Sequence, residues 1–289
     1  MSNNNNNSER TKRVPAVAGM FYPNNLRDLR DLIERSFYDQ RFGPGRTPPY
    51  FGKRRIYGMV SPHAGYVFSG AIAACGYYEV SAIDFENVIM VGPNHYGIGS
   101  GVAMAKSSDW ETPFGKVGLN SDLSIKISKE SNITDFDDFA HSKDHCLEVQ
   151  LPFLQYIKSN FRIVPIILRM QDIETALDLG NAIADTIIEE RDKTLLIASS
   201  DFTHYEPNTE AHRKDTELIK TILSLDVNKF YTILERLNVS ACGYGAIASI
   251  MVAAKNLGAT RGELLRYATS GDVTGDASAV VGYASIVFV

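Results

Sequence analysis

The stretch Asn87-Val88-Ile89-Met90-Val91-Gly92-Pro93-Asn94-His95 decides the fold of this chain. Residues 88–91 are a continuous apolar run, too short to span a membrane and flanked by residues that form turns. Such a run is typical of a strand buried on both faces, in a parallel sheet covered by helices. Gly92-Pro93 ends the strand, because proline has no N–H to donate to a neighbouring strand. We therefore expect His95 just beyond the carboxyl end of a central strand, where open α/β sheets bind their ligands.

The same pattern occurs twice more along the chain. Residues 56–60 are largely apolar and lead into Ser61-Pro62-His63, and residues 194–198 lead into Ser199-Ser200-Asp201-Phe202-Thr203-His204. Three buried strands are thus each followed by a histidine. Because functional residues gather at the carboxyl ends of parallel strands, the pattern predicts one site that contains His63, His95 and His204.

The rest of the chain predicts a single α/β domain with a central, mostly parallel sheet and helices on both faces. Its 289 residues contain no stretch that reads as a linker, so one domain over residues 14–289 follows a flexible, asparagine-rich tail over residues 1–13. Pro165 predicts an edge position or a bulge for its strand. Asp144 is expected to cap a helix from His145 to Tyr156, with a kink or a restart at Pro152. Further helices and strands are expected over residues 26–38, 69–80, 173–191, 210–223, 227–237, 244–257, 262–270 and 279–289.

Composition excludes several classes of function. A net charge of −5 and a pI near 5.7 provide no basic surface for nucleic acid or anionic lipid, so neither nucleic acid nor a membrane is an expected partner. No hydrophobic segment follows the basic end of the tail, which therefore does not read as a signal peptide. Three cysteines, odd in number and far apart, are typical of free thiols in a reducing, cytoplasmic environment.

Cys242 is the most informative of these thiols. It precedes the expected helix over residues 244–257, where unpaired N–H groups and the helix dipole favour a thiolate; the alternative is a small apolar filler. Two imidazoles with one thiolate are a coherent ligand set for iron, copper or zinc, and the sequence does not choose among them. Nucleotide-binding glycine loops, a C-x-x-C pair, an H-E-x-x-H helix and a serine-hydrolase elbow are all missing from the sequence.

Two pairs of residues have the spacing of a helical face. If the loop after residue 199 turns helically, Asp201 and His204 lie side by side, and a carboxylate next to an imidazole suits a general acid/base or a further metal ligand. His145 and Glu148 repeat this spacing. His145 can reach the same pocket, whereas Glu148 is equally well explained as part of a helix cap. The remaining histidines are expected at the surface: His141 and His212.

Six motifs, in order over nearly the whole chain, resemble the Memo family, called AmmeMemoRadiSam system protein B in many prokaryotes. The motifs are VAGMFYP within residues 15–23, SPHAGY at 61–66, GPNHYG at 92–97, DHCLEVQLPF at 144–153, SSDFTHY at 199–205 and ACGYGA at 241–246. The resemblance implies a fold similar to that of class III extradiol ring-cleaving dioxygenases, which hold non-haem Fe(II) through two histidines and a glutamate.

Carried over by motif, His63 and His95 match the two ligand histidines, and His204 matches the acid/base position. Cys242 stands where this family has a cysteine in place of the dioxygenase glutamate. A thiolate is a softer ligand than a carboxylate and favours Cu(I) or a tuned iron site, so ring cleavage does not follow from the fold.

Asp201 and His145 also match family pocket residues. The resemblance further implies that the pocket binds iron or copper and takes part in redox chemistry. It also implies association with a radical SAM protein and an AMMECR1-like protein.

We therefore expect a non-haem, iron- or copper-dependent oxidoreductase of unknown substrate. His63, His95 and Cys242 would hold the metal, and His204, Asp201 and His145 would be catalytic; a zinc hydrolase ranks lower. The alternative is a non-catalytic metal- or peptide-binding module that acts with partner proteins. In that case aromatic side chains would line the pocket and accept a peptide or an aromatic small molecule: Tyr66, Tyr96 and Tyr205.

Overall fold

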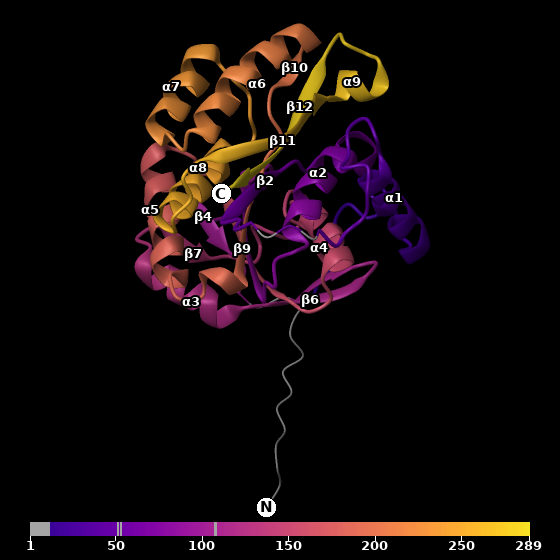
Figure 1. The fold of residues 1–289 in the computed structure, drawn as a ribbon. Coiled ribbons are helices and arrows are strands. Elements are labelled where there is room, and N and C mark those ends of the chain that lie inside the picture. Colours follow the sequence, from indigo (N-terminus) through magenta and orange to yellow (C-terminus); the bar gives the residue numbers. More distant parts are fainter. Residues whose placement is uncertain (1–11, 51, 53, 107–108) are drawn as a thin grey trace, which may run out of the picture.

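The structure is a computed structural model that describes residues 12–50, 52, 54–106 and 109–289. Within these residues it forms one α/β domain around a twelve-stranded mixed sheet (Figure 1). The strands, in chain order, are β1 Lys12–Arg13, β2 Gly58–Ser61, β3 Asn87–Pro93, β4 Val102–Met104, β5 Asp109–Thr112, β6 Gly115–Leu119, β7 Thr134–Phe136, β8 Arg162–Leu168, β9 Thr194–Ser199, β10 His204–Glu206, β11 Gly262–Thr269 and β12 Val280–Phe288.

The helices alternate with these strands. They are α1 Leu26–Tyr38, α2 Tyr66–Val80, α3 Ser121–Glu130, α4 Leu151–Ile157, α5 Ile173–Ile187, α6 Asn208–Leu223, α7 Val227–Leu237, α8 Tyr244–Asn256 and α9 Ser270–Thr274. Short 3₁₀ turns cover Glu148–Gln150 and Arg191–Lys193. The α/β architecture predicted from the sequence is confirmed.

The centre of the sheet is parallel. Strand β3 lies between β8 and β9, with Ile89 opposite Val164 on one side and Leu196 on the other. Strand β2 continues the parallel order beyond β9, and β12 then pairs with β2 in the antiparallel sense. Every residue of β3 is buried, as the apolar run predicts. The last two strands, β11 and β12, are antiparallel neighbours.

Helices cover both faces of the sheet. Helices α1, α2 and α4 lie on one side of the sheet, and α3, α5, α6, α7 and α8 lie on the other (Figure 1). The apolar side chains of each group form a core with the face that the group covers. Helices α5 and α8 pack closely because Gly180 of α5 has no side chain. A Cβ there would lie 2.6 Å from the Ser249 carbonyl oxygen.

Side chains cap the amino ends of α1 and α5. The side chain of Asn25 accepts the N–H of Asp28 at 2.9 Å, and that of Asp172 accepts the N–H of Thr175 at 2.8 Å. Each carboxamide or carboxylate oxygen thus satisfies an N–H that the first helical turn leaves unpaired.

Two predictions about proline and capping were wrong. Strand β8 is not at an edge: β3 pairs along one side of it, and β6 and β4 pair along the other. Pro165 is tolerated because it falls between the residues that β6 and β4 engage, so no partner there needs its N–H. The helix after Asp144 does not start at His145: α4 begins at Leu151 with Pro152 in its first turn, so the restart expected at Pro152 is observed.

The domain begins earlier in the chain than the boundary predicted at residue 14. Lys12 and Arg13, placed in the tail from sequence, form β1 and pair with β5; residues 1–11 of that tail lie outside the described residues.

In the part of the chain that the structure describes, no helix is long and apolar enough to cross a membrane.

Candidate metal centre

A cavity of about 680 Å³ lies at the carboxyl edge of the parallel strands. Strands β2, β9 and β3 are neighbours in the sheet, so the segments that follow them meet at this edge. The cavity is lined by His63, His95, His145, Asp201, His204 and Cys242, together with Met20, Phe21, Ala64, Gly65, Phe68, Tyr205, Ser240, Val281 and Tyr283. All six residues predicted to form the site are therefore brought together.

The ring of His63 is buried and held in one tautomer. Its Nδ1 lies 3.0 Å from the Ser199 hydroxyl, which itself donates to the Cys146 carbonyl at 2.6 Å. Because the single hydroxyl proton of Ser199 is used, Nδ1 of His63 must be the donor, and Nε2 keeps its lone pair. Burial, followed by the neighbouring His95, lowers the pKa of His63 well below its usual value.

The ring of His95 is oriented by Asp144. One carboxylate oxygen of Asp144 accepts the backbone N–H of His95 at 2.7 Å, and the other lies 3.1 Å from His95 Nδ1. Although burial opposes its ionisation, the hydrogen bonds from His95 and Cys146 lower the pKa of Asp144 below its usual range. An ionised Asp144 accepts the Nδ1 proton of His95 and leaves the lone pair on Nε2, an arrangement common among metal-binding histidines.

His145 completes a cluster of three imidazoles. Its ring stacks on that of His95, with centroids 4.5 Å apart, and lies edge-on to that of His63 at 5.4 Å. One ring nitrogen from each of the three histidines lies within 4.8 Å of the others, a spacing that one metal ion can bridge. Burial, with His63 and His95 nearby, lowers the pKa of His145 to about 3, so the imidazole is neutral at pH 7.

Cys242 lies beside this cluster and does not belong to the group within 4.8 Å. Its Sγ is 3.1 Å from His63 Nε2 and accepts the N–H of Asp201 at 3.3 Å. Burial, and then the charge of Asp201, raise the pKa of Cys242, which opposes the expected thiolate. Helix α8 begins two residues later, at Tyr244, and the N–H groups of Gly243 and Gly245 at its start donate to Ser200 and Gln171.

Asp201 and His204 do not share a helical turn, because residues 200–203 are irregular and His204 begins β10. Asp201 accepts the backbone N–H of His63 at 2.8 Å, and burial raises its pKa. His204 Nδ1 lies 2.9 Å from the Ser240 carbonyl oxygen, which can only accept. His204 therefore carries its proton on Nδ1, and Nε2 is left as an acceptor in the half-buried wall of the cavity.

Several residues around the site were missed or misplaced from sequence. His141 is buried, not exposed, because its Nε2 donates to the Ala103 carbonyl and its ring packs edge-on against Trp110. His212 is partly exposed, as expected. Of the three tyrosines expected to line the pocket, Tyr205 does so, whereas Tyr66 and Tyr96 are not among the lining residues.

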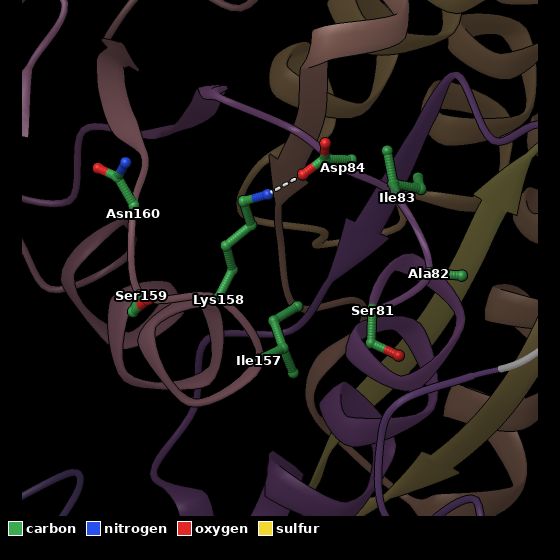
Figure 2. A pocket seen from close by; sticks show the side chains of 8 residues that line it. All are labelled: Ser81, Ala82, Ile83, Asp84, Ile157, Lys158, Ser159 and Asn160. Atoms are coloured by element: carbon green, nitrogen blue, oxygen red, sulfur yellow. Dashed lines mark hydrogen bonds and ion pairs between the residues drawn. The ribbon is translucent and has the colours of Figure 1, made fainter.

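A second cavity, of about 540 Å³, lies at the amino ends of β3 and β8 (Figure 2). It is lined by residues 81–84 and 157–160, and Figure 2 shows the ion pair between Lys158 and Asp84 inside it. Its lining contains no histidine or cysteine. Chemistry, not size, therefore identifies the histidine-lined cavity as the functional site.

The fold and the imidazole cluster together define an α/β protein with a histidine-lined pocket at the carboxyl edge of its sheet. Comparison with known proteins agrees with this class. The sequence model of the family described as "Memo-like protein" matches residues 13–287. The chain belongs to the Memo family, which confirms the resemblance and its dioxygenase-like α/β fold.

Relatives match over nearly their full length. The chain is 50% identical over 278 residues to a MEMO1 family protein of Nitrosopumilus maritimus, covering 96% of this chain and 99% of the relative. It is 46% identical over 275 residues to a MEMO1 family protein of Methanothermobacter thermautotrophicus (95% and 99%) and 47% identical over 281 residues to one of Methanopyrus kandleri (96% and 99%).

Proposed function

We propose that this Memo-family protein is a non-haem metal-dependent oxidoreductase that holds iron or copper through His63, His95 and His145. The observation that carries the proposal is the approach of three ring nitrogens, one per histidine, to within 4.8 Å of one another. Two of these rings are held in the tautomer that a metal ligand needs, by Ser199 and Asp144. Neutral imidazoles suit iron, copper and zinc, and disfavour magnesium and calcium.

The sulfur of Cys242 favours a redox metal over a hydrolytic one. A thiol 3.1 Å from His63 Nε2 is close enough to join a ligand set that includes His63 once it loses its proton. Sulfur ligands favour Cu(I) or tuned iron, and a thiol at an accessible zinc site would be exposed to oxidation without benefit to hydrolysis. We therefore prefer iron or copper to zinc, with Cys242 as an additional ligand on the His63 side of the cluster.

The remaining polar residues have roles in binding and proton transfer. Bound iron or copper would supply electron transfer to or from a substrate. His204 lines the cavity with its Nδ1 against the Ser240 carbonyl, so Nε2 of the neutral imidazole can accept a substrate proton. Asp201 fixes the backbone of His63 and lies 4.0 Å from its Nε2. This assignment moves His145 from the expected catalytic group to the metal ligands.

The test is metal analysis of protein purified without oxygen, followed by the same analysis of His145→Ala and Cys242→Ala. We expect stoichiometric iron or copper in the parent protein, a large loss in His145→Ala and a smaller loss in Cys242→Ala. Full occupancy by a redox metal in His145→Ala would remove His145 from the ligand set. Zinc as the resident metal, with no change of oxidation state in air, would overturn the oxidoreductase proposal.

The rim of the cavity favours one alternative, a non-catalytic metal- or peptide-binding module. Met20 is 73% exposed and Tyr205 79% exposed, and both lie at the lining of the cavity. Tyr205 also adopts a left-handed backbone conformation, with φ at 59°, which is unusual for a bulky residue and common at functional sites. The predicted association with a radical SAM protein and an AMMECR1-like protein belongs to the same alternative. Retention of metal without oxygen consumption would favour it.

A further inference from the structure

The segment over residues 12–25, which we call the N-terminal strap, crosses the outside of the metal centre and ends at α1. It begins with β1, which pairs with β5, and turns sharply at Gly19, whose φ is 86°. Its contacts converge on one buried carboxylate, that of Glu148, three residues after His145.

Glu148 is fully buried and accepts four hydrogen bonds, all from the strap. The donors are the Arg13 guanidinium at 2.7 Å, the backbone N–H groups of Ala16 at 2.7 Å and Val17 at 3.1 Å, and the Tyr22 hydroxyl at 2.7 Å. These bonds use both carboxylate oxygens. A buried charge satisfied in this way fixes the distance between the strap and the segment that carries His145.

Arg13 ties the same strap to the loop before His145. Its other guanidinium nitrogens donate to the backbone carbonyl of His141 at 2.8 Å and to that of Asp144 at 2.5 Å. The planar guanidinium also lies 4.1 Å from the centre of the Trp110 ring, which limits its movement. Arg13 therefore holds the backbone of Asp144, whose carboxylate orients the ring of His95.

The turn of the strap reaches the metal centre itself. The ring of Phe21 lies 4.6 Å from that of His145, on a cavity wall that Phe21 shares with Met20. The Phe21 carbonyl accepts the N–H of Tyr66, the first residue of α2, so the turn is attached at both sides. His145 is thus confined between the ring of Phe21 and the stacked ring of His95.

We propose that the N-terminal strap is a positioning device for the metal centre, in which Glu148 and Arg13 hold the strap and Phe21 sets the orientation of the His145 ring. The inference rests on the proposed metal site. None of these three residues offers a metal ligand in this arrangement; each acts through His145 or Asp144. Loss of the strap contacts would leave the ligands present but less well oriented, and metal affinity would fall.

The experiment measures Co(II) binding to the full-length chain by competition with a chelator, together with the visible spectrum of the bound Co(II). We expect Glu148→Gln to lower the affinity about 10- to 100-fold, as supporting residues around metal sites commonly do, and Phe21→Leu to lower it less. Both variants should shift the Co(II) absorption bands, because the ligand geometry changes. Glu263→Gln, which breaks a pair with Arg54 far from the cavity lining, is the matched control and should bind normally.

A second measurement separates positioning from general destabilisation. In a His145→Ala background, Phe21→Leu should no longer change the Co(II) affinity, because the ring it orients is gone. An equal loss in both backgrounds would overturn the proposal. So would folded Glu148→Gln that binds Co(II) as tightly, and with the same spectrum, as the parent.

The two proposals fail differently. If the parent chain binds no Co(II), both the metal site and the strap's role are wrong. If the parent binds and the strap variants match it, only the strap's role is wrong. Where Glu148→Gln does not fold, Phe21→Leu decides, since it removes no buried charge.

Discussion

The two cavities at opposite edges of the sheet are similar in volume, about 680 Å³ and about 540 Å³, yet they bury different chemistry. At the carboxyl edge, His63 and Asp144 are almost wholly buried. The Nδ1 of His63 is hydrogen-bonded to the Ser199 hydroxyl, and the carboxylate of Asp144 is hydrogen-bonded to His95. At the amino edge, Lys158 pairs with Asp84 (Figure 2). The Asp84 side chain is 96% exposed and that of Lys158 is 23% exposed. Burial lowers the pKa values of His63 and His145 at the carboxyl edge, whereas at the amino edge the hydrogen bond from Lys158 lowers the pKa of the exposed Asp84.

That difference follows from which segments of the chain form each edge of the sheet. At the carboxyl ends, three adjacent parallel strands are each followed by a polar segment that lines the cavity. His145, which precedes α4, and Met20 and Phe21 of the N-terminal strap complete the lining. At the amino ends, the segments come from the ends of α2 and α4 and lie open. Electrostatic interactions are much stronger where water is excluded, so the carboxyl edge can specialise for chemistry.

The largest effect should come from removing a ligand imidazole. His95→Ala is expected to lower metal affinity by more than about 100-fold, because it removes one of the three imidazole ligands and leaves Asp144 without its partner. Equilibrium competition with a chelator measures this. Lys158→Met, at the other cavity, is the control and should leave affinity unchanged; similar losses in both variants would end the distinction between the two edges.

The buried carboxylates should make stability depend on pH at the carboxyl edge. Burial raises the pKa of Asp215 from 3.8 to about 6, although Thr203 and Tyr267 donate to it. The folded state therefore holds the proton more tightly than the unfolded state, and the free energy of unfolding falls as pH rises from about 4 to about 6. At 1.36 kcal/mol per pKa unit the effect is about 3 kcal/mol.

Denaturant unfolding of the parent chain and of Asp215→Asn at several pH values measures this dependence. The stability of the parent relative to the variant should decline across that pH range, since asparagine does not titrate. Parallel curves for the two proteins would show that Asp215 keeps an ordinary pKa in the folded chain.

Asp144→Asn should have a smaller effect on metal binding than loss of a ligand. The amide keeps the size of the side chain but weakens the acceptor for His95 Nδ1, so the ring is less firmly held and less basic. A loss of affinity of about 10- to 100-fold is expected, with the fold intact by circular dichroism. Unchanged affinity would mean that the Nδ1 contact is not what orients His95.

The smallest effect should come from the amino-edge cavity. Lys158→Met removes an ion pair that solvent screens, so no measurable change in thermal stability is expected at moderate salt. Differential scanning calorimetry at low and high salt checks this. A clear loss of stability at both salt concentrations would show that the pair is not a simple surface contact.

Sequence patterns predicted the strands of the core and the edge at which the site lies. The apolar runs before His63, His95 and His204 were sufficient to identify these strands, because a strand buried on both faces of a parallel sheet is a short, continuous run of apolar residues. The same patterns placed Pro165 at an edge and started a helix at His145. Both errors arose because neighbouring strands and turns, not local preference, decide which N–H groups need partners.

The roles of individual residues around the site were harder to predict. Asp144 read as a helix cap and Glu148 as its companion, yet one orients His95 and the other anchors the N-terminal strap. Their partners are 49 and 135 positions away in the chain, so no local spacing could reveal them. The approach of His145 to His63 and His95 is of the same kind.

By itself, then, the sequence determined the family, the α/β architecture and the set of side chains that meet at the carboxyl edge, because these depend on local apolar periodicity and on motifs that lie within single segments. Only the tertiary structure decided which imidazoles come within reach of one ion, which ring nitrogens face fixed hydrogen-bond partners and that the sulfur of Cys242 lies against His63 Nε2. Those properties depend on contacts between distant segments and on the exclusion of water, and neither is encoded at any one position of the chain.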